Sequence, residues 1–192
     1  MSNETKAQKK QRLLIKISLT ALFAAFTAAG AFIVIPVGPV PIVLQNMFAV
    51  LSGLILGPLL GSAAVVLYIL AGILNFPVFA GGVGGIAVIM GPTGGFLFGY
   101  LMAAFTAGLI AGKPVQGQKL PLMRLILAVL IGFLIVYVPG LFWLKMRLDL
   151  DWIRAFMIGF VPFIIGDVIK GIAAVFIVPR LRKIAADYIS DQ

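Results

Sequence analysis

The stretch FIIGDVIKGIAA, from Phe163 to Ala174, has the composition of a membrane-spanning helix, yet it contains Asp167 and Lys170. A charged side chain near the centre of a bilayer costs about 2.5–3.5 kcal/mol on insertion scales. The two residues are three positions apart, so on a helix they share a face and partly neutralise each other. One interpretation is a structural ion pair. Because charges inside membrane spans usually serve function, we favour a ligand site to which the pair offers an acceptor and a donor.

The composition of the whole chain also indicates a membrane protein. The 192 residues are 62% hydrophobic and 11% charged, whereas a soluble domain is about 25% charged. The first apolar run, 13–35, exceeds the apolar region of a signal peptide, so we expect it to be retained. We therefore predict a basic cytoplasmic tail over residues 1–12, one membrane-embedded domain over 13–183 and a second cytoplasmic tail over 184–192.

Six segments have the composition of membrane spans, each of which needs about 20 mostly apolar residues. They are 13–35, 42–57, 59–75, 93–112, 121–144 and 161–179, and the last is expected to begin near Pro162. With the N-terminus in the cytoplasm, eleven Lys and Arg residues lie inside, three lie outside, and Lys170 lies within a span. This bias predicts an all-α, multi-pass protein of the cell membrane: a bundle of six transmembrane helices with both termini cytoplasmic.

Two segments expected on the outer side carry no charge. IPVGPVPIVLQN, residues 35–46, has three prolines, and NFPVFAGGVGGIAVIMGPTGG, residues 75–95, has seven glycines and two prolines. Irregular backbone at membrane depth is tolerated only where it is buried in protein or lines a cavity. We therefore expect both apolar loops to pack over a ligand pocket as a lid.

Several residues in or beside these segments are candidates for contacts with a ligand. An amide can donate and accept, glycines let a backbone approach closely, and aromatic rings can wall a cyclic ligand. The alternatives are a helix cap, a flexible turn and ordinary packing, respectively. The candidates are Gln45, Gly81, Gly82, Tyr68, Phe79 and Phe96.

The first span contains small residues at every fourth position, at Ala21, Ala25 and Ala29. Small residues at this spacing let another helix approach closely. The strip either packs inside the protein's own bundle or docks a partner membrane protein, and the sequence leaves both possibilities open.

Several classes of function are poorly supported. The chain has no Cys and no His, which removes the commonest nucleophile–base pairs and metal ligands. The nearest approach to a nucleotide-binding loop, GLIAGKP at 108–114, has the wrong spacing and a Pro in place of Ser or Thr. We therefore expect no enzyme activity, catalytic residue, metal or cofactor. Despite a net charge of +9, the basic residues sit at chain ends and in loops, so we expect no nucleic-acid partner.

Three stretches, taken together, resemble the BioY family. They are IPVGPVPIVLQNMFAVLSGLILGPLLG at 35–61, LNFPVFAGGVGGIAVIMGPTGGFLFGY at 74–100 and PFIIGDVIK at 162–170, and the resemblance covers about 13–183. The chain departs from the family pattern at Ile165, where members often have Pro, and at Asn46, where they often have Thr.

The resemblance implies a biotin-binding S-component of an energy-coupling factor transporter. Such a subunit captures biotin and needs an energising module of a transmembrane coupling protein and two ATPases. Asp167 would then accept hydrogen bonds from the ureido N–H groups, and Lys170 would donate to the ligand's carboxylate or to its ureido oxygen. The alternatives are an S-component for another vitamin, such as thiamine or riboflavin, and a membrane scaffold subunit that transports nothing.

Overall fold

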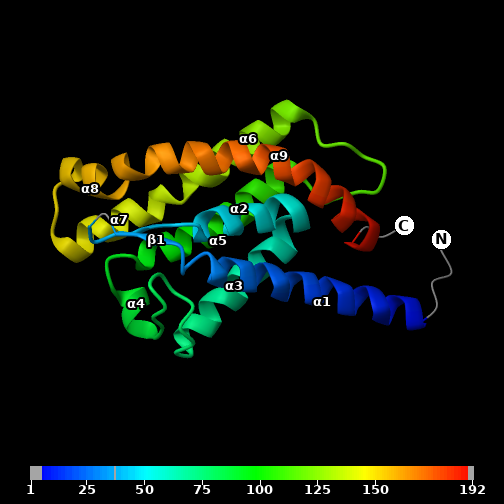
Figure 1. Ribbon diagram of the computed structural model, residues 1–192, viewed down its shortest axis with the longest axis horizontal. Helices are drawn as coiled ribbons and strands as arrows, with labels where there is room; N and C mark the ends of the chain where they lie inside the picture. Colours follow the sequence, from blue (N-terminus) through cyan, green and yellow to red (C-terminus); the bar gives the residue numbers. More distant parts are fainter. Residues whose placement is uncertain (1–5, 37, 190–192) are drawn as a thin grey trace.

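Each of the six apolar segments contains helix in the computed structural model, which describes residues 6–36 and 38–189. The helices run lengthwise through an elongated bundle (Figure 1). They are α1 (Lys6–Ala29), α2 (Gln45–Leu56), α3 (Pro58–Ile73), α4 (Ile86–Met90), α5 (Gly94–Ala111), α6 (Leu122–Ile135), α7 (Tyr137–Leu148), α8 (Trp152–Gly159) and α9 (Ile164–Ile189). Two short strands, β1 (Val34–Ile35) and β2 (Ile42–Val43), and a 3₁₀ turn, η1 (Val161–Phe163), complete the fold.

Helix length separates the apolar segments into two groups. Four helical stretches of the described chain are long and apolar enough to cross a membrane: Lys6–Ala29, Gly94–Ala111, Leu122–Leu148 and Trp152–Ile189. The two others, α2 and α3, are shorter apolar helices. The protein is thus mostly helical with several apolar helices, and the number of spans and the orientation of the termini stay predictions.

Several predicted boundaries differ from the observed ones. The first segment was expected to be helical to residue 35, but α1 ends at Ala29, and a turn and β1 follow. In the last segment Pro162 lies in the 3₁₀ turn η1, so the α-helix begins two residues later than expected, at Ile164. It continues to Ile189, beyond the expected end near 179. Regular helix therefore extends into both of the predicted tails. The N-terminal end of α1 and the C-terminal end of α9 lie at the same end of the bundle (Figure 1).

The segment 121–144 is not one continuous helix. It divides into α6 and α7 at Val136, because Pro139 has no N–H to donate to the carbonyl of Ile135. The sequence also gave no indication of α8, a short helix that returns the chain to α9. Its N-cap is Asp151, whose carboxylate accepts a hydrogen bond of 2.8 Å from the backbone N–H of Arg154.

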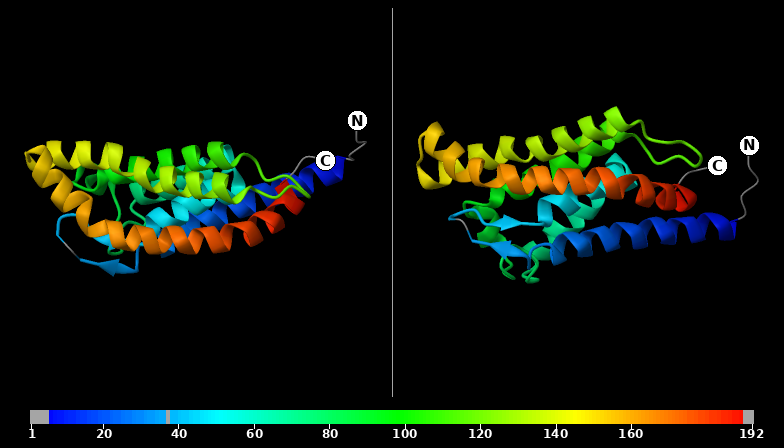
Figure 2. Two further views of the ribbon diagram at one scale, coloured as in Figure 1. Left: turned by 90° about the horizontal axis from the view of Figure 1, so that it is seen from above. Right: turned by 45° about the horizontal axis from the view of Figure 1, so that its top comes forward.

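The two charge-free loops contain regular structure that was not predicted. In the first, β1 and β2 pair antiparallel, with Val34 opposite Val43. The second contains an isolated bridge between Phe79 and Val83, followed by α4. Figure 2 shows both loops at the end of the bundle away from the chain termini.

The core lies around α2 and α5, which pack directly against each other. Helix α5 presents small buried residues, including Ala103, Ala104 and Ala107, so neighbouring helices approach it closely. Outside this core, many large apolar side chains are exposed; Ile165 and Phe176, for example, are 76% and 74% exposed. A broad apolar surface of this kind indicates contact with lipid.

Candidate ligand site

The predicted charge pair forms an ion pair in the interior of the protein. Asp167 lies in the first turn of α9 and Lys170 one turn further on. The Lys170 Nζ lies 2.9 Å from the Asp167 Oδ1, and the two side chains are only 6% and 9% exposed. Two buried opposite charges are tolerated when further hydrogen bonds satisfy their remaining donors and acceptors. The groups around the pair therefore decide what it can do.

Asn46, in the first turn of α2, connects to both members of the pair. Its Nδ2 donates to the Asp167 Oδ1 at 2.9 Å, and its Oδ1 accepts from the Lys170 Nζ at 2.9 Å. The same Oδ1 also accepts from the backbone N–H of Met47. One amide thus matches an acceptor to the ammonium and a donor to the carboxylate, and it joins α2 to α9.

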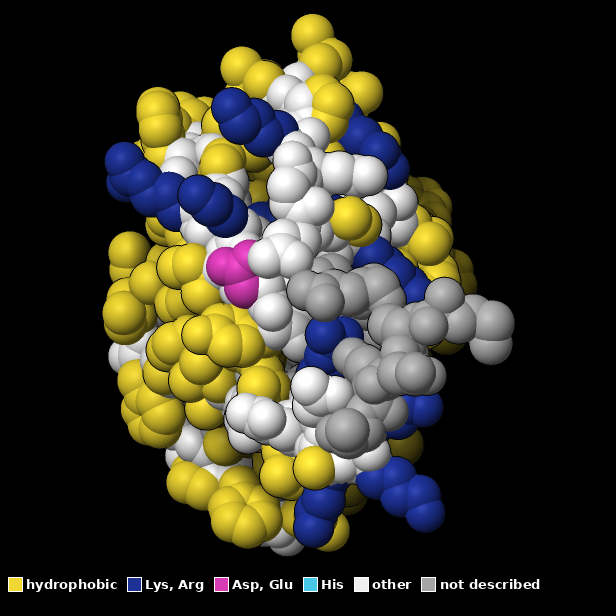
Figure 3. All heavy atoms as spheres, turned by 90° about the vertical axis from the view of Figure 1, so that its right-hand side faces the viewer, with side chains coloured by type: hydrophobic (Ala, Val, Ile, Leu, Met, Phe, Trp, Pro, Cys, Tyr) yellow, Lys and Arg dark blue, Asp and Glu magenta, His cyan; other side chains and the backbone are white. Residues whose placement is uncertain are grey.

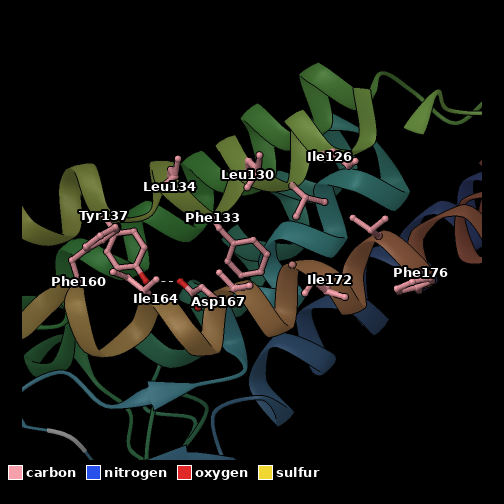
Figure 4. Close-up of a pocket in the computed structure, with 14 residues that line it drawn as sticks. Ile126, Leu130, Phe133, Leu134, Tyr137, Phe160, Ile164, Asp167, Ile172 and Phe176 are labelled. Carbon is pink, nitrogen blue, oxygen red and sulfur yellow. Dashed lines mark hydrogen bonds between the residues drawn. The ribbon is translucent and has the colours of Figure 1, made fainter. Parts of the chain in front are cut away.

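Tyr137 supplies the fourth member of this network. It follows the break between α6 and α7, and its hydroxyl donates to the Asp167 Oδ2 (Figure 4). The ring of Phe160 packs edge-on against the Tyr137 ring, with 4.7 Å between centroids. The network therefore joins three separate parts of the chain: the start of α2, the start of α7 and the first turns of α9.

The hydrogen-bond count shows which groups remain for a ligand. A lysine ammonium has three N–H donors, and within the described residues those of Lys170 reach two acceptors, on Asn46 and Asp167. The Asp167 Oδ1 already accepts from two donors, and its Oδ2 accepts from Tyr137. The arrangement leaves a donor on Lys170, while Asp167 mainly holds its neighbours in place.

Two cavities lie beneath the loops. The larger, about 150 Å³, is lined in part by Gln45, Phe79 and Phe96, and by residues of both loops. The smaller, about 30 Å³, contains Asn46 and Lys170 in its wall. The cavities share a set of lining residues: Val40, Pro41, Val43, Phe96 and Tyr100. They therefore adjoin, with an apolar chamber under the loops and a polar recess at the charge pair.

The predicted contact residues occupy different positions around these cavities. Gln45, Phe79 and Phe96 line the larger cavity. Tyr68 lies behind the wall: its hydroxyl accepts a 2.5 Å hydrogen bond from the Gln45 Nε2, and its ring packs edge-on against Phe79. The Gln45 Nε2 also donates to the carbonyl of Val78. Tyr68 thus holds the side chains of Gln45 and Phe79 in place in the cavity wall.

Gly81 and Gly82 form the turn that joins the bridged residues Phe79 and Val83. Both have positive φ, 82° and 72°, which glycine adopts without strain. Neither lines either cavity, whereas the adjacent Ala80 and Val83 line the larger one. The turn therefore places its neighbours over the cavity, and a direct contact of either glycine with a ligand stays a prediction.

The alanine strip lies apart from the cavities. Ala21, Ala25 and Ala29 are all exposed on α1, whereas Ala24, on the adjacent face, is buried in the core. The structure thus leaves the strip accessible, and its use by a partner stays a prediction.

Sequence reasoning did not assign three polar residues to the site, although it noted Asn46 as a departure from the family pattern. Asn46 and Tyr137 are far from Asp167 in the chain, and Tyr100 lines both cavities from α5. One indication was available: Asn46 is a polar residue inside an apolar segment, and such residues usually have a buried partner. No spacing rule identifies that partner when it lies more than a hundred residues away.

The family of the chain follows from comparison with known proteins. A model of the BioY family matches residues 2–187. The chain belongs to the BioY family. The resemblance predicted from the sequence is thereby confirmed over almost the whole chain.

Individual members of the family are similar along their full length. A protein of Pyrococcus horikoshii named "Probable biotin transporter BioY" is 42% identical over 167 residues, which cover 87% of this chain and 96% of the relative. The "Biotin transporter BioY" of Thermotoga maritima is 40% identical over 176 residues, 92% and 99% of the two chains. The crystal structure of the S-component for biotin from an ECF-type ABC transporter matches with a TM-score of 0.79 at 31% identity, covering 94% of this chain and 95% of that one.

Proposed function

We propose that this BioY-family protein is the biotin-binding S-component of an ECF-type transporter, which captures biotin at the cell membrane and passes it to an energising module. The family match and the names of its relatives support this proposal. The single observation that carries it within the structure is the polar recess at Lys170, which adjoins an apolar chamber under two ordered loops.

The chemistry of biotin matches this combination. Its ureido group offers two N–H donors and one carbonyl acceptor, its thiophane ring is apolar, and its valerate tail ends in a carboxylate. The remaining donor of Lys170 suits either the ureido oxygen or the carboxylate. The rings of Phe79 and Phe96 provide apolar walls, and a ligand that left the buried ammonium unmatched would lose about 1–3 kcal/mol.

We further propose that Asp167 acts mainly by positioning. Its carboxylate holds Lys170, Asn46 and Tyr137 at once, so its loss would disturb three groups. Its Oδ2 has room for one further donor, such as a ureido N–H. This refines the expectation that Asp167 is a direct acceptor.

Uptake in this proposal requires partners. The energising module would comprise a transmembrane coupling protein, docked on the strip of Ala21, Ala25 and Ala29, and two ATPase subunits. The protein alone would then bind biotin without transporting it.

Binding of radiolabelled biotin to the purified protein tests the proposal. We expect saturable binding that unlabelled biotin displaces and that thiamine and riboflavin do not. Displacement by one of those vitamins would assign a different substrate, and the absence of any vitamin binding would favour a scaffold subunit.

A pair of variants tests the role of Lys170. Lys170→Met should weaken binding about 10- to 150-fold, as expected for the loss of a hydrogen bond from a charged donor worth about 1.5–3 kcal/mol. Lys119→Met, at an exposed loop position, is the matched control. The two variants are then compared with biotin amide, which has no carboxylate. A Lys170→Met effect that disappears with the amide assigns Lys170 to the carboxylate, and an effect that persists assigns it to the ureido oxygen.

A further inference from the structure

A third and larger cavity lies on the surface of the bundle, between α6 and α9. It has a volume of about 430 Å³. Figure 4 shows Ile126, Leu130 and Leu134 of α6 facing Ile172 and Phe176 of α9 across it, with Tyr137 and Phe160 at the far end. We call this cavity the α6–α9 groove. It is distinct from the two cavities under the loops.

The walls of the groove are apolar. The polar side chains in its lining are Tyr137 and Asp167, and these are hydrogen-bonded to each other. Its rims are exposed: Leu130 and Ile172 are 54% and 55% exposed. The groove thus lies on helices that are long and apolar enough to cross a membrane and is open to the side, where a bilayer would supply hydrocarbon.

The dimensions of the groove suit one hydrocarbon chain. From Ile126 in α6 to Tyr137 at the start of α7 the chain advances eleven residues, about 16 Å at 1.5 Å per residue. Half of the hydrocarbon core of a bilayer is about 15 Å thick. The two helices meet at the floor of the groove, where a Cβ built on Gly171 would lie 3.4 Å from the Val129 Cγ1.

One end of the groove is basic. Arg180 and Lys183 follow Phe176 by four and seven residues, so they lie on the same face of α9, and both are exposed. Figure 3 shows Lys and Arg side chains distributed over this end of the molecule, with apolar side chains between them. In the predicted orientation this end faces the cytoplasmic leaflet, where anionic lipids attract basic residues.

We propose that the α6–α9 groove binds one acyl chain of an anionic phospholipid, whose phosphate lies against Arg180 and Lys183. The length and apolar walls of the groove suit a hydrocarbon chain, and the basic end selects the charge of the headgroup. The bound chain would cover the Tyr137–Asp167 hydrogen bond from outside and keep water from the buried carboxylate.

Native mass spectrometry tests this proposal directly. The protein is purified in mild detergent and offered phosphatidylglycerol and phosphatidylcholine with identical acyl chains. We expect one phosphatidylglycerol per monomer to be retained in preference to phosphatidylcholine. The double variant Arg180→Gln, Lys183→Gln should bind it about thirtyfold more weakly, at about 1 kcal/mol per basic residue. Ile172→Trp, which fills the groove, should abolish retention of the lipid.

Matched controls separate the groove from general lipid contact. Leu127→Trp changes an exposed α6 residue, 47% exposed, that does not line the groove. The double variant Lys9→Gln, Lys10→Gln removes two exposed charges from α1. Both should retain the lipid. Equal retention of the two lipids, equal losses in the control variants, or a dimer whose formation is blocked by Ile172→Trp would each overturn the proposal.

Discussion

Replacement of Arg182 by Met should be among the most destabilising single changes in this protein. Arg182 lies in the second half of α9, is 8% exposed, and has no carboxylate partner among the described residues. Its guanidinium instead donates to backbone carbonyls at the ends of two other helices. The Nη1 donates to the carbonyl of Leu54 at 2.5 Å, and the Nη2 donates to Ala111, Gly112 and Lys113 at 3.0, 2.7 and 2.8 Å.

The magnitude follows from which of these carbonyls water can reach. The last four carbonyls of a helix have no partner within it, and Leu54 and Ala111 belong to the last turns of α2 and α5. Both residues are buried, at 0% and 3% exposed, whereas Lys113 is exposed. Two buried acceptors therefore lose their partner. At about 1–3 kcal/mol for each unpaired acceptor we expect about 4 kcal/mol, equivalent to a Tm lower by about 8–16 °C for a chain of this length.

The assay is thermal unfolding in lipid-free detergent, followed by the intrinsic fluorescence of Trp143 and Trp152. Arg180→Met is the matched control, because Arg180 is two residues away and exposed. Arg182→Lys should recover part of the stability, since an ammonium keeps the charge but cannot reach both helix ends. If Arg182→Met unfolds at the same temperature as Arg180→Met, the carbonyl contacts do not stabilise the protein and the reasoning is wrong.

Three further predictions concern the ligand and the energising module. Asp167→Asn should weaken biotin binding by about 1.5–3 kcal/mol, because it disturbs the groups that Asp167 holds and removes a charged acceptor; folding is checked separately by thermal unfolding, and unchanged affinity in a folded variant would refute its role. Biotin should slow hydrogen exchange in segments 38–44 and 75–85 more than in the helices, whereas equal exchange would indicate a static pocket. Ala25→Trp, on the exposed strip of α1, should preserve biotin binding but abolish uptake and co-purification with the energising module; loss of binding would show that the strip packs within the protein.

The sequence predicted the features that depend on local spacing. The apolar segments coincide with helices, and the i, i+3 spacing of Asp167 and Lys170 brings the two side chains together as expected. The charge-free loops were expected over a pocket, and residues of both line the larger cavity. Each of these inferences uses a helical period or a composition, which a single sequence contains.

The features that escaped prediction depend on contacts between distant segments. Asn46 and Tyr137 meet Asp167 only after α2, α7 and α9 have packed. Arg182 was assigned to the cytoplasmic side with the other basic residues, and nothing in the sequence distinguishes it from the exposed Arg180. Strands of two residues, such as β1, are too short for an alternating pattern to be recognised.

The two buried cations of α9, Lys170 and Arg182, contact groups near opposite ends of the short helix α2. At twelve residues α2 is about 18 Å long, less than the hydrocarbon core of about 30 Å, so its polar ends need partners within the protein. At its first turn, the Asn46 side chain meets Asp167 and Lys170, and near its last turn the Leu54 carbonyl meets Arg182.

Helix α9 therefore holds α2 at both ends. Asp167 and Arg182 are fifteen residues apart, about 22 Å along the helix, and the shorter α2 packs against α9. The far end of α2 is fixed by a charged group that has no alternative partner among the described residues. A ligand that engages Lys170 or Gln45 consequently cannot slide α2 without breaking the Arg182 contacts. The structural response to binding should therefore be confined to the loops above the cavity, which is why hydrogen exchange is expected to change there and not along α2.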